Sequence, residues 1–346
     1  MKTNTQVKPV EAALSHYKKM TIDALLGMVP SKEPHHYLYD LIPSYPQRAG
    51  KGLRPGLCLA TCRAFGGDVQ SALPSAVSLE LFHNAFLVHD DIADQSEYRR
   101  GKMTMHAEHG VAIALNVGDA MNVLSIRPLM ANLSRLGPNL TWRIFSEIEH
   151  MVRQSVEGQA LELGWVRDNV CGLSEADYLL MTLNKTCWYT CIHPCRIGAL
   201  IATGGEIDLD RFNRFGYYMG LAFQIQDDIL NLIGDPEKYG KETGGDIWEG
   251  KRTLMLIHLL NQCTPGEKET IRRFLSVPRK NRLKKDVRLI YRLMSKYDSI
   301  EYAKSSARQL AGAALREFLV AYRDAPQTDD KEFIQSIVIY MIERDL

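Results

Sequence analysis

Two clusters of aspartate residues are the features of this sequence best suited to chemistry. The first, Asp90-Asp91-Ile92-Ala93-Asp94, ends an apolar stretch at 79–88, and the second lies within 224–231. On a helix, residues four apart lie on one face, so Asp90 and Asp94 point the same way. Clustered carboxylates at the end of a buried helix repel one another and are costly to desolvate, so a cation must compensate. The candidate metal ligands are Asp90, Asp91, Asp94, Asp227, Asp228 and Asn231.

Oxygen ligands of this kind suit a hard divalent cation. Mg²⁺ takes one or two carboxylates and leaves its other positions to water and to the phosphate oxygens of a substrate. Two such helices facing each other would place several carboxylates around one cavity. The sequence therefore predicts Mg²⁺ as the cofactor, in a cluster of ions that holds a diphosphate.

Basic residues precede the first cluster, follow each cluster and occur between the two. Arginine forks and lysine point charges are the usual partners of phosphate groups. Their position beside carboxylates indicates two anion sites, one bound through metal and one bound directly. The candidate cations are Lys51, Arg54, Arg99, Arg100, Lys185, Lys241 and Lys251.

Helices are the elements expected to position these side chains. Apolar residues recur at three- and four-residue spacing, glycine and proline turns separate the segments, and strand signals are nearly absent. The fold class predicted is all-α, a single large helical bundle around a central cavity, with residues 1–346 in one domain. The predicted helical segments are 75–94, 111–133, 140–163, 174–203, 209–233, 253–262 and 301–322.

Composition limits the partners. The chain has 42 Lys and Arg against 41 Asp and Glu, and this balance argues against a protein built mainly to hold nucleic acid or an anionic membrane. No apolar run reaches the length of a spanning helix, and the first residues lack the pattern of a secretory signal. We predict a cytoplasmic protein without stable membrane insertion. The basic stretch 279–288 is expected to be a solvated face and receives no function.

The seven cysteines are an odd number and predict no disulfide framework. Cys187, Cys191 and Cys195 lie four apart with His193 nearby, which invites a metal interpretation. Zinc sites usually bring ligand pairs from separate elements, so buried small side chains on one helix face are the better prediction.

With these residues in view, the sequence resembles the trans-isoprenyl diphosphate synthases, the polyprenyl synthetase family, from about residue 50 to about residue 260. Each motif alone is weak, but the ordered set is highly specific. The motifs are Gly50-Lys51-Gly52-Leu53-Arg54-Pro55, the first aspartate cluster, Arg99-Arg100-Gly101, His106, Gly158-Gln159, Lys185-Thr186, the second cluster, and Gly240-Lys241 through Asp246 to Gly250-Lys251.

The resemblance implies a Mg²⁺-dependent head-to-tail condensation of an allylic diphosphate with isopentenyl diphosphate, by ionisation, condensation and elimination. It implies that the allylic diphosphate binds through Mg²⁺ to Asp90, Asp94 and Asp227, assisted by Arg99, Lys185 and Lys241. Isopentenyl diphosphate would bind without metal to Lys51, Arg54, His83 and Arg100. Oxygens of Lys185, Thr186 and Gln224 would stabilise the nascent cation. The resemblance also implies a homodimer.

The sequence departs from the family pattern at Asn231 and in the segment Cys187-Trp188-Tyr189. Asn231 stands where the family usually has aspartate, which removes one negative charge and predicts weaker metal binding without loss of activity. Trp188 and Tyr189 follow Lys185-Thr186 where small residues are usual. These aromatics either narrow the cavity or pack at an interface, and packing is the favoured interpretation.

Product length in this family depends on residues one and two turns before the first aspartate cluster. Small Ala85 argues against the shortest product, whereas Phe82 and Phe86 argue against a long open tunnel. Farnesyl or geranylgeranyl diphosphate is expected, with geranylgeranyl ahead.

Two other functions compete. A class I terpene cyclase shares the first aspartate cluster, but it usually carries an asparagine followed by Ser or Thr four residues later, and no asparagine here has that neighbour. The direct anion site would also be idle in a cyclase. A non-catalytic partner subunit of a synthase tends to lose its aspartates, and this chain keeps them.

Overall fold

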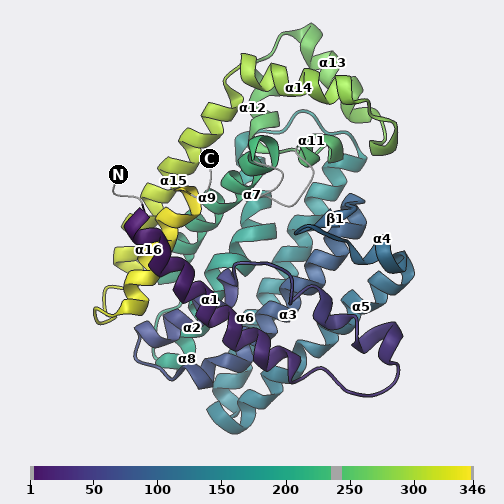
Figure 1. Cartoon of the computed structure of the whole chain (residues 1–346). Coiled ribbons are helices and arrows are strands. Elements are labelled where there is room, and N and C mark those ends of the chain that lie inside the picture. The colour runs from purple at the N-terminus through teal and green to yellow at the C-terminus, as the bar shows by residue number, and fades with distance from the viewer. Residues whose placement is uncertain (1–3, 235–243, 344–346) are drawn as a thin grey trace.

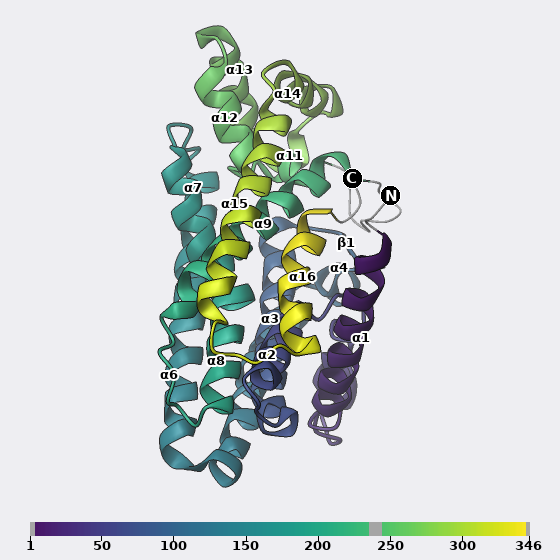
Figure 2. The ribbon, with the colours of Figure 1, turned by 90° about the vertical axis from the view of Figure 1, so that its left-hand side faces the viewer.

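The computed structural model describes residues 4–234 and 244–343 and is built almost entirely of helices, so the predicted all-α class is confirmed (Figure 1). Long helices run roughly side by side along the molecule (Figure 2). In the part of the chain that the structure describes, no helix is both long enough and apolar enough to cross a membrane.

The centre of the bundle is formed by α2 (Leu53–Ala64), α3 (Val69–Asp94), α6 (Ile126–Arg167), α9 (Arg211–Ile233) and α15 (Ser299–Ala321), which pack through buried apolar side chains. Burial of each such side chain contributes about 1.5–3 kcal/mol. The helices α1 (Asn4–Leu26) and α16 (Asp329–Glu343) cover α2, and α5 (Val111–Leu124) packs on α3.

Polar residues and glycine explain several boundaries. Asp68 accepts hydrogen bonds from the N–H groups of Gln70 and Ser71, so α3 begins six residues before the predicted helix at 75–94. The prediction of one continuous helix over 111–133 is wrong, because the helix is interrupted at Ser125, between α5 and α6. Gly137, with φ +77°, kinks α6 between the predicted segments 111–133 and 140–163.

The predicted helix 174–203 consists of three pieces: α7 (Glu175–Thr182), the π-helix η3 (Leu183–Ile192) and α8 (His193–Ala202). Ser174 and Asp177 form a reciprocal capping pair at the start of α7. The π-helix was not predicted, since apolar spacing does not separate it from an α-helix. Such wide turns occur often at functional sites.

A short hairpin after α3 also escaped the sequence analysis. The strands β1 (Tyr98–Arg99) and β2 (Lys102–Met103) pair in antiparallel fashion around a turn at Arg100-Gly101, where φ is +54° and +73°. The hairpin therefore presents two adjacent arginines. The short helices η1 (His35–Tyr39) and η2 (Ile42–Ser44) precede α2, and α4 (Met105–His109) follows the hairpin.

The C-terminal third adds a second apolar cluster at one end of the molecule (Figure 1). Its buried side chains come from α7, α9, α15 and the elements between α9 and α15. Those elements are α11 (Gly245–Glu249), α12 (Leu254–Gln262), α13 (Pro265–Ser276) and α14 (Lys284–Lys296), whereas the short helix η4 (Arg279–Asn281) between α13 and α14 contributes no buried side chain.

Candidate active site

A cavity of about 560 Å³ lies among the central helices and gathers most of the predicted site residues. Asp91 and Asp94 do not line it, and Lys241 lies outside the described residues. The predicted residues that line it are Lys51, Arg54, His83, Asp90, Arg99, Arg100, Lys185, Thr186, Gln224, Asp227, Asp228, Asn231 and Lys251.

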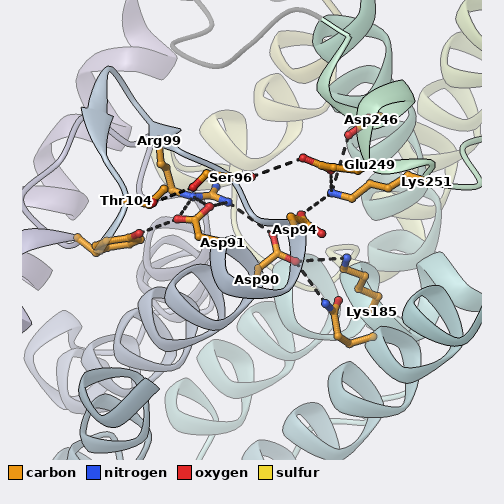
Figure 3. A network of polar contacts seen from close by, with 12 residues as sticks. Asp90, Asp91, Asp94, Ser96, Arg99, Thr104, Lys185, Asp246, Glu249 and Lys251 are labelled. Atoms are coloured by element: carbon orange, nitrogen blue, oxygen red, sulfur yellow. Dashed lines mark hydrogen bonds and ion pairs between the residues drawn. The ribbon is translucent and has the colours of Figure 1, made fainter. Parts of the chain in front are cut away.

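Asp90 is the carboxylate of the first cluster that faces the cavity. Its oxygens lie 3.6 Å from the Lys185 ammonium and 3.5 Å from the Arg99 guanidinium, and Gln159 donates to it at 3.4 Å (Figure 3). Burial disfavours the Lys185 ammonium, but the Glu162 and Asp90 carboxylates outweigh this and raise its pKa. Lys185 is therefore a permanent cation beside Asp90.

Asp94 is joined to the chain that follows the second cluster. Lys251 donates to it at 2.8 Å and also lies 2.9 Å from Glu249 and 3.8 Å from Asp246 (Figure 3). Burial, and then the neighbouring Asp90 carboxylate, raise the pKa of Asp94 to about 7. A bound cation would reduce the repulsion between the Asp94 and Asp90 carboxylates.

Asp91 has a different environment from its neighbours. It is fully buried, with 0% of its surface exposed, and the Tyr45 hydroxyl donates to it at 2.6 Å. Arg99 Nε lies 2.8 Å from both of its oxygens. Both oxygens of the Asp91 carboxylate are therefore bonded to Arg99, and Asp91 does not line the cavity.

In the second cluster, Asp228 is held by two donors. The Tyr178 hydroxyl donates at 2.9 Å and Gln224 Nε2 at 2.8 Å. Burial is the main reason that the pKa of Asp228 is raised to about 7, and the neighbouring Asp227 adds to it.

Asn231 accepts hydrogen bonds from two backbone N–H groups. Its Oδ1 accepts the Asp246 N–H at 2.9 Å, and its carbonyl accepts the Gly244 N–H at 2.8 Å. The amide thereby fastens the start of α11 to the end of α9.

A chain of hydrogen bonds at the cavity begins at Thr186 on the π-helix. The Thr186 hydroxyl donates to Gln224 Oε1 at 2.9 Å, while the other end of that amide donates to Asp228. Because both ends of the Gln224 amide are engaged, its oxygen has a fixed direction.

A second group of cations, Lys51, Arg54 and Arg100, also lines the cavity. Arg54 is buried, donates to Thr190 Oγ1 at 2.8 Å, lies 3.3 Å from His83 Nε2 and stacks 4.1 Å above the Tyr189 ring. Burial, then Arg54 and Arg100, hold the pKa of His83 well below its usual range, so this imidazole is neutral. Gly50 lies against the Arg100 guanidinium, which a Cβ at this position would approach to 2.5 Å.

Comparisons with known proteins agree with this geometry. Residues 35–294 match the family described as polyprenyl synthetase. The chain belongs to that family. It is 31% identical to the geranylgeranyl diphosphate synthase of Saccharolobus solfataricus, over 80% of this chain and 82% of the relative.

Solved structures show the same fold within the polyprenyl synthetase family. The geranylgeranyl pyrophosphate synthetase of Pyrococcus horikoshii matches with a TM-score of 0.84 and 30% identity, over 98% of this chain and 99% of that one. A polyprenyl synthase of Caulobacter crescentus, complexed with calcium and isoprenyl diphosphate, matches with a TM-score of 0.82 and 26% identity, over 99% and 97%. The predictions of a prenyltransferase of isoprenoid biosynthesis and of this all-α fold are confirmed.

Sequence analysis of this polyprenyl synthetase missed three acidic residues at the site. Glu162 accepts a hydrogen bond from Lys185, and Glu249 pairs with Lys251. Glu80 lies buried among cations, and burial raises its pKa although Arg54 and Arg100 oppose the rise. An acidic residue inside the apolar stretch Leu79-Glu80-Leu81 was the available signal, since a buried carboxylate needs a partner.

The two aromatics after Lys185-Thr186 have different roles. Tyr189 lines the cavity with Phe86, and their ring centroids are 5.7 Å apart. Trp188 instead packs between His150 and His193, at 4.6 and 5.2 Å. Packing, the favoured interpretation, therefore describes only Trp188.

Two further predictions, on product length and on the cysteines, can be compared with the structure. Neither Ala85, which is fully buried in the apolar cluster with α5, nor Phe82 lines the cavity, so the product-length prediction rests on Phe86, which does. The three cysteines predicted to be buried are fully buried, and burial raises the pKa of each thiol, most strongly for Cys187 and Cys191.

Asp228 supports a prediction about stability. Its pKa of about 7 lies above its ordinary value near 3.8, so between these values the folded state binds a proton that the unfolded state has lost. Stability from this group is therefore present at low pH and lost as pH rises through about 7. Relative to Asp228→Asn, the wild type is expected to lose up to about 3 kcal/mol of unfolding free energy between pH 5 and 8, as measured by urea denaturation in EDTA.

The exposed aspartate variant Asp23→Asn is the matched control, and its curve should run parallel to that of the wild type. Parallel curves for Asp228→Asn as well would contradict the assigned environment of Asp228.

Proposed function

We propose that this polyprenyl synthetase joins an allylic diphosphate to isopentenyl diphosphate, with the first diphosphate held through Mg²⁺ and the second held directly. In the reaction the allylic C–O bond breaks, a C–C bond forms to the isopentenyl double bond, and a proton passes to the departing diphosphate. The observation that carries the proposal is one cavity lined by carboxylates from α3 and α9 and, elsewhere, by Lys51, Arg54 and Arg100.

The donor set fits Mg²⁺ chemically. Asp90, Asp227 and Asp228 offer hard carboxylate oxygens to the same cavity, with Asp94 beside Asp90. Among the described residues no three acidic, histidine or cysteine side chains already converge on one metal position, so diphosphate and water oxygens complete the coordination in this proposal. When bound, Mg²⁺ stabilises negative charge on the leaving diphosphate.

The protein's own cations share that task. Lys185 and Arg99 lie beside Asp90, and their charges are preorganised by Glu162 and Asp91. In this proposal Asp91 is a positioning residue that holds Arg99 and is removed from the ligand set. The Gln224 oxygen, fixed by Asp228, faces the nascent carbocation together with the Thr186 hydroxyl.

The direct site takes the diphosphate of isopentenyl diphosphate. Arg54 and Arg100 supply cationic forks, Lys51 supplies a third charge, and neutral His83 adds a hydrogen-bonding ring. Buried Glu80 offsets the repulsion among these cations before the substrate binds.

Product length follows from the aromatic end of the cavity. Phe86 meets Tyr189 edge to face, and Phe82 stacks behind Phe86 at 6.4 Å. This wall supports a short product, with geranylgeranyl diphosphate expected ahead of farnesyl diphosphate.

Phe86→Ala is expected to lengthen the main product by at least one isoprene unit, because it removes the ring that closes the cavity beside Tyr189. The measurement is chromatography of the dephosphorylated alcohols. Phe86→Tyr keeps the bulk and should keep the product. An unchanged product from an active Phe86→Ala enzyme would contradict this assignment.

The homodimer is also part of the proposal. Large apolar side chains stay exposed on α5 and the first half of α6, and Trp142 is 73% exposed. The others on this face are Val111, Leu115, Val123, Ile126, Met130 and Leu133.

Val123→Glu with Met130→Glu is expected to halve the mass measured by light scattering during size-exclusion chromatography, since charges would enter the interface. Leu319→Glu, which changes an exposed leucine of α15, is the control and should leave the mass unchanged. A wild type of monomer mass would refute the dimer.

The activity is tested by incubation with labelled isopentenyl diphosphate and dimethylallyl, geranyl or farnesyl diphosphate, with Mg²⁺ or with EDTA. Metal-dependent elongation supports the proposal. A cyclic hydrocarbon made from farnesyl or geranylgeranyl diphosphate alone, without elongation, would overturn it in favour of a cyclase. Failure with every primer, with an altered product profile of a second synthase, would indicate a partner subunit.

A further inference from the structure

Charge is divided unevenly along this chain. Residues 265–296, which span α13, η4 and α14, contain eleven Lys and Arg but three Asp and Glu, a net charge of +8. The whole chain carries +1, so the remainder carries −7. The overall balance therefore hides a strongly basic segment, which forms one end of the molecule (Figure 1).

The outer face of α14 concentrates this charge. Lys284, Lys285, Arg288 and Arg292 are exposed, at a spacing that places them on one side of the helix. The opposite side is buried in the second apolar cluster through Val287, Ile290, Leu293 and Met294. We call the four exposed cations the α14 basic face.

No carboxylate of residues 4–234 or 244–343 forms an ion pair with the α14 basic face. By contrast, Lys296, one turn beyond Arg292, is paired with Glu267 at 2.7 Å. Three further exposed cations, Arg272, Arg273 and Lys280, lie in the neighbouring α13 and η4. The face thus offers a row of positive charges that form no ion pair with any acidic side chain the structure describes.

Apolar side chains accompany the basic face. Leu283, directly before α14, is 53% exposed, and Tyr291 is 39% exposed. An aliphatic residue and a tyrosine beside lysine and arginine are typical of a helix that lies in the headgroup region of a bilayer. A nucleic-acid backbone would bind the cations but offers no apolar partner to the exposed Leu283.

The basic end is firmly joined to the active site. The buried Arg282 guanidinium donates to the carbonyls of Trp248 and Leu275 at 2.6 and 3.0 Å, which fixes the turn before α14 against α11. Arg279 donates to the Asp94 carbonyl at 2.6 Å and to Glu249 at 3.0 Å. The basic end is therefore joined to the first aspartate cluster by direct hydrogen bonds.

We propose that the α14 basic face, with Leu283 and Tyr291, is a docking surface for an anionic lipid bilayer. Docking is peripheral: the cations attract acidic headgroups, and the two apolar side chains enter the interface. Such docking would place the site near the phase into which a product with a long hydrocarbon tail partitions. That benefit rests on the proposed function, but the docking itself does not.

The test is sedimentation of the full chain with vesicles of phosphatidylcholine alone or with 30% phosphatidylglycerol. Binding to the anionic vesicles is expected, and it should weaken between 0.05 and 0.5 M salt. Each cation near an anionic surface contributes about five-fold to the partition coefficient. The variant Lys284→Gln, Lys285→Gln, Arg288→Gln, Arg292→Gln is therefore expected to bind at least about a hundred-fold less.

A matched variant removes the same charge elsewhere, through glutamine at the exposed positions Lys32, Arg308, Arg316 and Arg323. It should bind like the wild type. Thermal unfolding and condensation activity in solution check that both variants fold, and binding is measured without turnover, so an inactive protein would not affect this test.

Three results would overturn the proposal. The wild type could fail to bind anionic vesicles at low salt, or the two variants could lose binding equally. Duplex DNA could also bind as tightly as vesicles, with the same dependence on the α14 basic face, which would indicate a nucleic-acid surface.

Discussion

Replacing Asp90 by asparagine is expected to lower kcat by about a thousand-fold at saturating Mg²⁺, which corresponds to about 4 kcal/mol of transition-state stabilisation. The carboxylate faces the cavity, where it is the proposed metal ligand of the first cluster. The variant also deprives Lys185 and Arg99 of a common partner. The measurement is steady-state condensation over a range of Mg²⁺ concentrations.

Asp23→Asn on α1, an exposed aspartate paired with Lys19, is the control and should leave kcat unchanged. A kcat for Asp90→Asn within three-fold of the wild type, at any Mg²⁺ concentration, would remove Asp90 from the proposed metal site.

Replacing Lys185 by methionine is expected to lower kcat by about a hundred-fold. Methionine keeps most of the length but removes the cation beside the leaving diphosphate, and Glu162 and Asp90 then face each other without that ammonium between them. Single-turnover measurement with bound substrates separates this loss from weaker binding.

Lys304→Met, which removes a lysine paired with Glu301 on α15, is the matched control and should retain normal turnover. If Lys185→Met raised KM without changing kcat, Lys185 would serve only ground-state binding.

Most residues that line the cavity could be predicted from the sequence. Aspartates at one-turn spacing at the end of a buried stretch predicted carboxylates that face one another, and the cavity brings together Asp90 of α3 and Asp227 of α9. The order of the family motifs assigned Lys51 and Arg54 to the same site as the aspartates, although they lie far apart in the chain.

Other features depend on contacts between distant segments and could not be predicted. Asp91 is equal to Asp90 as a residue type, and only the packing of Tyr45 and Arg99 around it sets its separate role. Glu162 of α6 joins the site because it accepts a hydrogen bond from Lys185 of the π-helix. Helical periodicity contains no information on either contact.

The charge balance illustrates a limit of composition. A net charge of +1 argued against an anionic membrane as a partner, yet it sums a segment of +8 and a remainder of −7. The structure shows four exposed cations on the outer face of α14 that pair with no carboxylate of the described residues, and this placement supports the docking proposal.

The claim of two diphosphate sites, one dependent on metal and one independent of it, is tested most directly by calorimetric titration. The ligands are a non-ionising thio analogue of an allylic diphosphate and isopentenyl diphosphate, each titrated with Mg²⁺ and with EDTA. Binding of the allylic analogue is expected to disappear in EDTA, while isopentenyl diphosphate keeps its Kd within about three-fold, and Arg54→Gln should weaken only the latter. Equal metal dependence of both ligands would contradict the account.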